Sequence, residues 1–251
     1  MSANLEYEQQ RIDWYNAGSG RLNEIDGYNC DICKNKGIIA KLTENGEWYT
    51  SDCECQKIRN SLKISQKSGL GEIINTYTFD NFLADEKWQL EIKRKALDFC
   101  NDADAKCFYI GGQVGCGKTH ICTAIAAHYI KAGANVKYML WCDESKHLKA
   151  IANDGCYQEE IKKYKSVDVL YIDDFLKVQN GSAPSDADIK LAFEIINARI
   201  IDNNKTTIIS SEMALDELID YDEATMSRIY QKSKNYKITI AKDRSKNYRL
   251  K

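Results

Sequence analysis

From about residue 75 to its end, the chain alternates short apolar runs with longer amphipathic stretches. The short runs have the length and composition of buried strands, and they are 106–110, 136–141, 167–172, 206–210 and 237–240. The longer stretches favour helices, and they are 85–101, 119–132, one that ends near residue 165, 188–202, and short segments before the last strand. Because strands that alternate with helices form parallel sheets covered by helices, this pattern predicts an α/β fold.

Residues 1–75 contain four cysteines in two close pairs, and these are Cys30, Cys33, Cys53 and Cys55. A tight turn within each pair aims both sulfurs at one tetrahedral centre, so the spacing indicates a zinc ribbon. The turn signal Asn45-Gly46, between two strand-like runs, predicts a hairpin between the pairs. Four thiolates close the coordination sphere, so we expect a structural Zn²⁺; scattered free thiols or a redox pair are the alternative.

Residues 57–74 are polar and basic, with a break at Gly69-Leu-Gly71, which is typical of a helical linker that ends in a loop. We therefore predict two domains. The first, 1–75, is a small zinc-ribbon module with its linker. The second, 76–251, is the α/β domain with the parallel sheet.

Composition narrows the class of protein further. The chain has 251 residues, a net charge of −2 and no apolar run long enough to cross a bilayer. Its first residues lack the basic start and apolar stretch of a secretory signal, so we expect a cytoplasmic protein with reduced cysteines. Residues 227–251 hold nine Lys or Arg and one acid. This basic segment can attract nucleic-acid phosphates or serve only as a solvated surface.

Residues 112–119, GQVGCGKT, fit the phosphate-binding loop G-x-x-x-x-G-K-[ST] and stand between a predicted strand and a predicted helix. Glycines permit the tight curvature and the close approach of backbone N–H groups to phosphate. We expect Lys118 to reach the β- and γ-phosphates of ATP and Thr119 to bind Mg²⁺. The predicted nucleotide-binding residues are Gly112, Val114, Gly115, Cys116, Gly117, Lys118, Thr119 and His120.

Hydrolysis needs an acid at the end of a neighbouring strand, and the apolar run before residue 173 ends in Asp173 and Asp174. At the carboxyl edge of the sheet, Asp173 is expected to hold Mg²⁺ through its water shell, and Asp174 to orient or deprotonate the attacking water. A strand-end cap or turn is the alternative. The next strand ends in Ser210 and Ser211, which are candidate sensors of the γ-phosphate or ordinary helix caps.

Two arginines near the C-terminus complete the candidates. Arg228 stands on a predicted helix beyond the core strands, where it can act as an arginine finger on the nucleotide of a neighbouring subunit. Arg249 can approach phosphate in its own subunit, and either arginine is otherwise a surface charge. The predicted catalytic residues are thus Lys118, Asp173, Asp174 and Arg228, and the predicted sensors are Ser210, Ser211 and Arg249.

Six features, taken in order, resemble the DnaC/DnaI family of bacterial and phage replicative-helicase loaders, especially its zinc-bearing Gram-positive type. They are the four cysteines, TYTFDNF (76–82), GGQVGCGKTH (111–120), DVLYIDDF (168–175), TTIISSEM (206–213) and SRIYQ (227–231). The resemblance covers nearly the whole chain. It implies an AAA+ core that binds ATP and single-stranded DNA, a front module that grips a hexameric DnaB-type helicase, and self-association through an Arg228-like finger. Glu212 replaces the Asn usual after the sensor strand, and the lid domain of larger AAA+ proteins is not evident.

The predicted function is an ATPase that loads a DnaB-type helicase onto single-stranded DNA at replication initiation, with ATP, Mg²⁺ and structural Zn²⁺ as cofactors. One alternative is a transposition helper ATPase of the IstB type, which shares much of the C-terminal part but typically lacks the zinc module. Another is an adaptor that uses nucleotide as a switch with little turnover, because Asp174 is shorter than the usual Glu. A small-molecule kinase is disfavoured, because no arginine-rich lid or acceptor-binding motif accompanies the loop.

Overall fold

The computed structural model describes residues 2–67, 69–71, 73–178 and 182–250. The chain divides into two compact units, 1–63 and 64–251, each with a buried cluster of its own. The division falls inside helix α3 (Cys55–Lys67), whereas the boundary expected from the sequence lies further along the chain, near residue 75.

A β-hairpin forms the centre of the first unit. Its strands, β1 (Ile38–Leu42) and β2 (Trp48–Asp52), pair antiparallel. Residues 43–47 make the connecting turn, so the hairpin predicted around Asn45-Gly46 is confirmed.

Two helices precede the hairpin, and the sequence pattern predicted neither. They are α1 (Ser2–Ala17) and α2 (Leu22–Asp26). The amide side chain of Asn16 joins α1 to β1, because it donates to the Ala40 carbonyl and accepts from the Ala40 N–H, both at 3.0 Å. Because this helix contacts the hairpin through a polar side chain, its sequence shows no apolar periodicity that would predict a helix.

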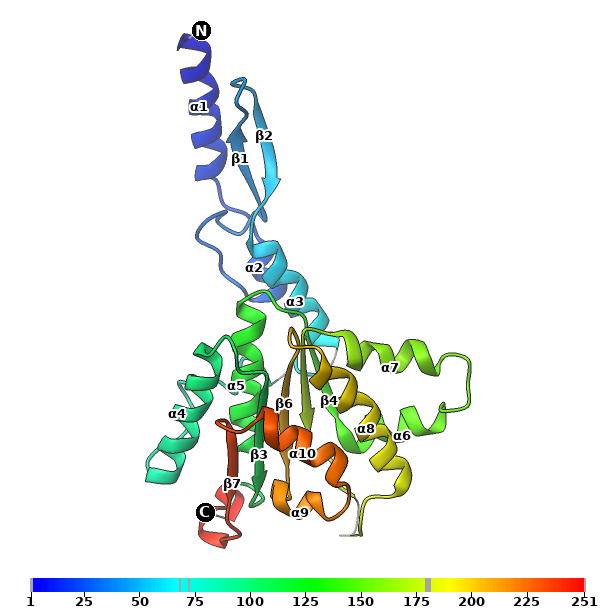
Figure 1. Ribbon diagram of the computed structural model, residues 1–251. Coiled ribbons are helices and arrows are strands. Elements are labelled where there is room, and N and C mark those ends of the chain that lie inside the picture. The colour runs from blue at the N-terminus through cyan, green and yellow to red at the C-terminus, as the bar shows by residue number, and fades with distance from the viewer. Residues whose placement is uncertain (1, 68, 72, 179–181, 251) are drawn as a thin grey trace. The chain divides into compact units, whose positions relative to one another are not determined.

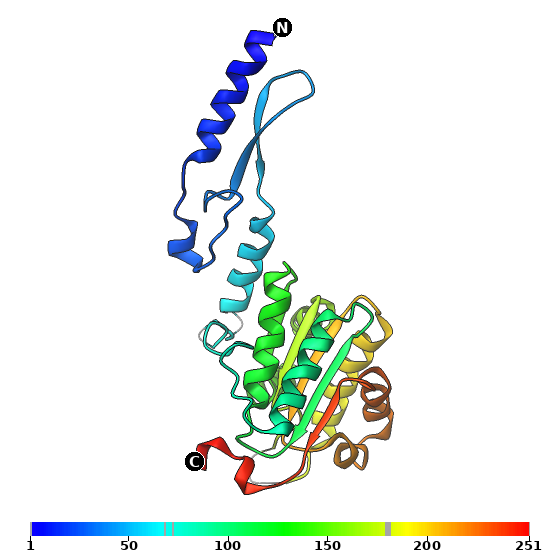
Figure 2. The ribbon, with the colours of Figure 1, turned by 90° about the vertical axis from the view of Figure 1, so that its left-hand side faces the viewer.

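The second unit is a parallel sheet with helices on both faces, as predicted. Among the described residues its strands lie in the order β4-β5-β6-β3-β7, and every neighbouring pair is parallel. They are β3 (Cys107–Gly112), β4 (Val136–Leu140), β5 (Val169–Asp173), β6 (Thr206–Ser211) and β7 (Lys237–Ile240). The last strand forms one edge of the sheet, beside β3 (Figure 2).

Helices alternate with these strands along the chain (Figure 1). They are α4 (Lys87–Asn101), α5 (Lys118–Lys131), α6 (Trp141–Ala150), α7 (Tyr157–Ser166), α8 (Asp186–Ile201), α9 (Leu215–Ile219) and α10 (Glu223–Lys232), followed by the short 3₁₀ helices η2 (Arg244–Lys246) and η3 (Tyr248–Leu250). The single helix expected to end near residue 165 is two helices, because residues 151–156 turn the chain between α6 and α7.

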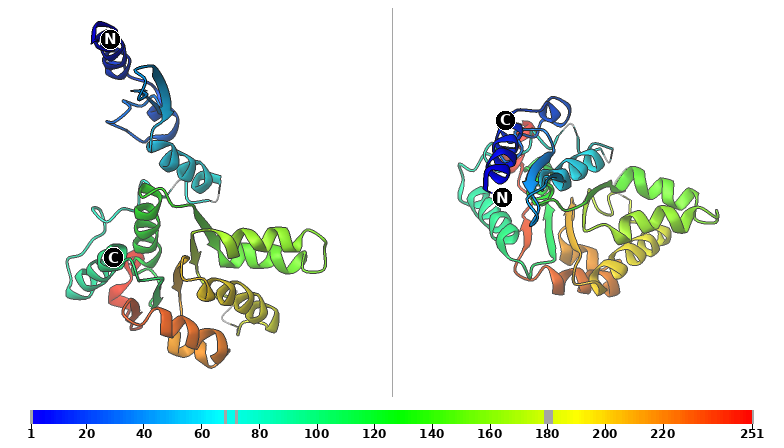
Figure 3. Two further views of the ribbon diagram at one scale, coloured as in Figure 1. Left: turned by 45° about the horizontal axis from the view of Figure 1, so that its top comes forward. Right: turned by 90° about the horizontal axis from the view of Figure 1, so that it is seen from above.

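The strands separate two helical layers (Figure 3). Helix α5 packs against β4, β5 and β6, with α4 beside it. On the other face, side chains of α6, α7, α8 and α10 pack with alternate strand residues such as Tyr109, Leu170 and Ile209 in one core cluster. Every residue of β3, β5 and β6 is buried, as expected for a sheet covered on both faces. Because all strands run in the same direction, the carboxyl ends of β3, β5 and β6 meet at one edge.

Candidate functional site

The phosphate-binding loop follows β3 and ends where α5 begins. Gly112 has φ +107°, and a Cβ atom there would lie 2.0 Å from the carbonyl oxygen of Ile240 in the neighbouring strand. Only glycine fits this position, because the backbone of β7 passes too close for a side chain. Gly117 caps α5 with φ +90°, so the N–H groups that open the helix are left for an anion.

Lys118, the first residue of α5, is buried at the loop. Its Nζ donates to the carbonyl oxygens of Gly112 at 2.9 Å and Gln113 at 2.6 Å. These bonds hold the ammonium group within the loop, at the place where phosphates bind in such loops. Cys116 is also buried, and its thiol donates to the same Gln113 carbonyl at 2.8 Å.

Thr119 and Asp173 meet at the carboxyl edge of the sheet. The Thr119 hydroxyl donates to Asp173 Oδ1 at 3.3 Å, and the Tyr138 hydroxyl donates to Asp173 Oδ2 at 3.1 Å. The Asp173 side chain is only 4% exposed, and burial raises the pKa of this carboxyl despite the opposing hydrogen bond from Ser210. A hydroxyl and a carboxylate at this distance are the oxygen ligands that Mg²⁺ prefers, so the pair fits the ion beside a bound phosphate.

From the sequence we expected β5, which ends in Asp173, to be the direct neighbour of β3, which leads into the phosphate-binding loop. The structure shows that it is not. Strand β6 lies between β5 and β3. Its residue Ser210 is fully buried, donates its hydroxyl to Asp173 and accepts the backbone N–H of Asp174 at 3.2 Å. Ser211 is used inside the fold, because its hydroxyl donates to the Phe175 carbonyl at 2.9 Å. Of the two serines predicted as sensors, therefore, Ser210 contacts the acidic residues.

A lysine that the sequence did not single out joins the remaining acids. Lys177 Nζ lies 2.9 Å from Asp174 Oδ2 and 2.7 Å from Glu212 Oε1. Burial lowers the pKa of Lys177, but the hydrogen bonds with Glu212 and Asp174 outweigh this effect, so the pKa is raised and the ammonium form is favoured. The only signal in the sequence was a lysine three residues after Asp174.

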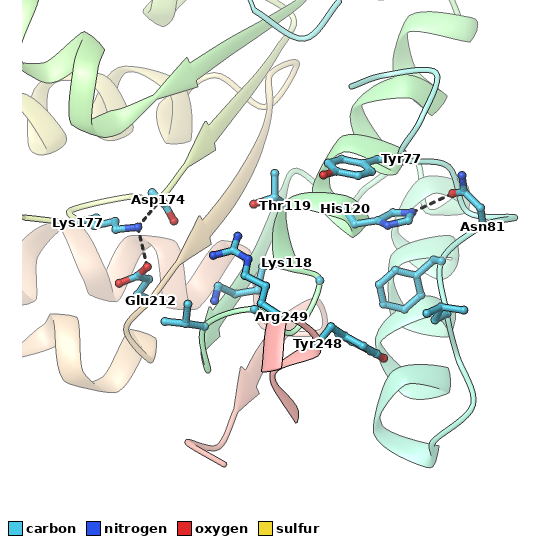
Figure 4. Close-up of a pocket in the computed structure, with 15 residues that line it drawn as sticks. Tyr77, Asn81, Lys118, Thr119, His120, Asp174, Lys177, Glu212, Tyr248 and Arg249 are labelled. Carbon is cyan, nitrogen blue, oxygen red and sulfur yellow. Dashed lines mark hydrogen bonds and ion pairs between the residues drawn. The ribbon is translucent and has the colours of Figure 1, made fainter. Parts of the chain in front are cut away.

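These groups line one cavity of about 340 Å³ (Figure 4). Its wall includes six of the predicted nucleotide-binding residues, Val114, Gly115, Gly117, Lys118, Thr119 and His120, together with Asp174, Lys177, Glu212 and Arg249. Gly112, Cys116 and Asp173 support this wall from inside the fold, as described above. Arg249 is brought to the cavity by the C-terminal segment, because the Tyr248 N–H donates to the Gly115 carbonyl at 2.9 Å.

Arg228 does not line this cavity. It lies half-buried on α10, donates to the Ala224 carbonyl at 2.8 Å and sits 5.5 Å from the centre of the Phe193 ring. The structure therefore leaves this arginine away from the nucleotide cavity of its own chain.

Another part of the cavity wall is formed by Tyr77, Asn81, Phe82 and His120. The His120 Nε2 faces the Thr78 carbonyl at 2.8 Å and Asn81 Oδ1 at 3.1 Å, so this nitrogen carries the hydrogen. The His120 ring stacks on Tyr77, with centroids 4.8 Å apart. Burial lowers the pKa of His120, which favours the neutral ring.

In the first unit, the four cysteines come together as predicted. Their sulfur atoms all lie within 4.8 Å of one another, with Cys30 and Cys53 3.8 Å apart and Cys33 and Cys55 3.5 Å apart. A tetrahedral zinc site with Zn–S bonds of about 2.3 Å places its sulfurs about 3.8 Å apart. All four side chains are buried, so the donor set fits a closed structural zinc site.

Arg59, which the sequence did not mark, supports this cluster from α3. Its side chain is 2% exposed and pairs with Asp26, itself 4% exposed, at 2.5 Å. A second nitrogen of the guanidinium donates to Asn35 Oδ1 at 3.2 Å. Burial lowers the pKa of Arg59, but hydrogen bonds to Asp26 and to Cys55 outweigh this effect, so the pKa is raised. The arginine thus ties the turn of the first cysteine pair to the second pair.

The fold and the cavity together define an α/β protein with a parallel sheet and a phosphate-binding loop at its carboxyl edge. The family model for "IstB-like ATP binding protein" matches residues 51–239, and the chain belongs to this family. The uncharacterized protein YqaM of Bacillus subtilis is 31% identical over 228 residues, which cover 85% of this chain and 72% of YqaM.

Two solved structures share the fold of the second unit. A crystal structure of DnaI superposes with a TM-score of 0.55 at 20% identity, covering 68% of this chain and 93% of that one. A crystal structure of the DnaC helicase loader superposes with a TM-score of 0.55 at 21% identity, covering 68% of this chain and 98% of that one. Among the described helices, none is long and apolar enough to span a membrane.

Proposed function

We propose that the chain is an ATPase that loads a hexameric, DnaB-type replicative helicase onto single-stranded DNA. The observation that carries the proposal is the meeting of Lys118, the Thr119–Asp173 pair and Asp174 around one cavity at the carboxyl edge of an AAA+ sheet. The shared fold with DnaI and the DnaC helicase loader supports the class of task.

The chemistry of the cavity supports binding and hydrolysis of ATP. Lys118 and the N–H groups that open α5 supply positive charge for the phosphates. Thr119 and Asp173 would hold Mg²⁺, which neutralises charge on the β- and γ-phosphates. Asp174 lines the cavity and would orient the attacking water, in the role proposed for it from the sequence.

We propose roles in helicase loading for three further parts of the molecule. Residues 1–75, with the cysteine cluster and its Zn²⁺, would bind the helicase. The basic segment 227–251 would contact the DNA phosphates. Arg228, away from its own cavity, would complete the site of a neighbouring subunit, so assembly and ATP hydrolysis would depend on each other. We propose that the protein works in the cytoplasm, where the replicative helicase acts.

A low-turnover adaptor is the second candidate, and a specific contact favours it. Lys177 pairs with the Asp174 carboxylate at 2.9 Å, so in the nucleotide-free protein this carboxylate is paired with an ammonium group instead of being available to activate water. A transposition helper of the IstB type remains the third candidate, since the family description is IstB-like. Filaments on duplex DNA would favour that function.

The proposal is tested with the full chain, its cognate helicase and ATP. We expect ATP turnover stimulated by single-stranded DNA or helicase, and we expect Lys118→Ala to lose both turnover and loading. If Lys118→Ala loads helicase as well as the wild type, the loader proposal is wrong. If Lys118→Ala still recruits helicase but fails to respond to ATP, the nucleotide is a switch for release rather than for recruitment.

A further inference from the structure

The turn after β5 holds its residues in an unusual backbone conformation. Asp174 has φ +54° and Leu176 has φ +55°, although neither is glycine. Both apolar residues of the turn are buried in the core, with Phe175 0% and Leu176 1% exposed. The Phe175 N–H donates to the Ser210 carbonyl at 2.8 Å, and the Lys177 N–H donates to the Asp174 carbonyl at 3.0 Å. Such strain persists only where the surroundings fix the backbone, and it is common at functional sites.

The consequence of this turn is the position of Lys177. With two apolar side chains anchored in the core, the chain returns to the cavity and presents the ammonium group between Asp174 and Glu212. These three side chains stand on one side of the cavity, and Lys118, Thr119 and Arg249 lie between them and His120 (Figure 4). The cavity therefore carries a second cation besides Lys118, held by acids that follow β5 and β6.

The charges around Lys177 make it able to exchange partners. An ammonium group has three N–H donors, and Asp174 and Glu212 take one each, so among the described residues one donor is left for a ligand. The Lys177 side chain is 36% exposed, so a group in the cavity can reach it. A terminal phosphate carries more charge than a carboxylate and offers three acceptor oxygens, so it competes well for this cation. A diphosphate, anchored by its β-phosphate in the loop, lacks the group that would extend across the cavity.

We propose that Lys177 binds the terminal phosphate of a nucleoside triphosphate and thereby distinguishes ATP from ADP. In the nucleotide-free protein it holds Asp174 and Glu212 together. When the triphosphate is bound, Lys177 turns to the γ-phosphate and releases Asp174 for the attacking water. This inference rests on the proposed nucleotide function and adds the residue that reads the nucleotide's state.

The test measures equilibrium binding and needs neither helicase nor hydrolysis. The non-hydrolysable analogue AMPPCP and ADP, each with Mg²⁺, are titrated calorimetrically into the wild type and Lys177→Met. We expect the variant to lose about tenfold in its preference for AMPPCP over ADP, the ratio that corresponds to about 1.4 kcal/mol, while its affinity for ADP changes little. Lys163→Met is the matched control, because Lys163 pairs with Glu160 at 2.6 Å on the solvent-facing side of α7, outside the cavity. This control should keep the wild-type preference.

A double variant separates contact with phosphate from simple neutralisation of the acids. Lys177→Met with Glu212→Gln removes one charge of each sign, so the net charge of the cavity stays as in the wild type. If Lys177 contacts the phosphate, the double variant keeps the reduced preference of Lys177→Met. Restoration of the wild-type preference would overturn the inference, as would an unchanged preference in Lys177→Met. Failure of the wild type to bind either nucleotide would overturn the proposed function as well, and thermal unfolding without nucleotide confirms that each variant is folded.

Discussion

Replacement of Arg59 by Met should unfold the first unit or empty its zinc site. The Arg59–Asp26 pair is almost fully buried, and removal of one partner leaves the other charge without compensation. Breaking such a pair costs about 3–5 kcal/mol. This is a large share of the stability of a unit of this size, which depends on its metal as much as on a core. Arg59→Met should therefore lower Zn²⁺ retention by a factor of about 100 or more.

The structure also provides the controls for this experiment. In Arg59→Met with Asp26→Leu, two apolar side chains replace the buried pair, and we expect much of the lost stability to return. Arg11→Met is the matched single variant, because Arg11 pairs with Glu8 at 3.0 Å on the surface, where a pair contributes about 0.2–1 kcal/mol. Zn²⁺ retention is measured by competition with a chromophoric chelator, and folding by far-ultraviolet circular dichroism.

Two results would refute this reasoning. If Arg59→Met retains Zn²⁺ as well as Arg11→Met, the buried pair does not support the cluster. The double variant could also be as damaged as Arg59→Met, which would assign the effect to the lost contacts with Cys55 and Asn35 instead of to an uncompensated charge. Binding of ATP should be unchanged in every variant, because the nucleotide cavity belongs to the second unit.

Two further predictions concern the nucleotide cavity. Burial raises the pKa of Asp173, so the folded protein loses stability as the pH rises from about 4 through this raised pKa. At pH 7, Asp173→Asn should therefore raise the unfolding temperature of the nucleotide-free protein. The same variant should lose the further rise in unfolding temperature that Mg²⁺ and ATP give the wild type. A decrease in the nucleotide-free protein would contradict this sign. Gly115 has φ +73°, and a Cβ there would lie 1.9 Å from Asn247 Oδ1. Gly115→Ala should lower both the unfolding temperature and ATP affinity, and Asn247→Ala in the same chain should recover only part of the loss, because the backbone strain of about 1–2 kcal/mol remains.

The sequence predicted the strands and the phosphate-binding loop because their signals are local. The apolar run before Asp173 and the glycines before Lys118 are each contained within ten residues. Strand order is a long-range property, so the insertion of β6 between β5 and β3 was missed. The bond from Ser210 to Asp173 depends on that order and could not be predicted without it.

Residues whose partners are brought together only by the tertiary structure were also missed, for a related reason. Arg59 stands in a polar, basic stretch, where an arginine normally faces solvent, and only the tertiary structure buries it against Asp26. Lys177 follows a turn with positive φ at Asp174 and Leu176, and no glycine marks that turn in the sequence. The helix that contains Asn16 contacts the hairpin through a polar side chain, so no amphipathic pattern in the sequence predicted this helix.

The central claim, that the chain loads a replicative helicase, is tested most directly by the composition of its complex. The full chain is mixed with its cognate hexameric helicase and ATP, and the mass of the complex is measured before and after single-stranded DNA is added. The account predicts a stable complex with the helicase hexamer that releases this chain, and leaves helicase on the DNA, when DNA and hydrolysable ATP are both present. A chain that never binds the helicase, or that stays bound irrespective of DNA and ATP, would contradict it.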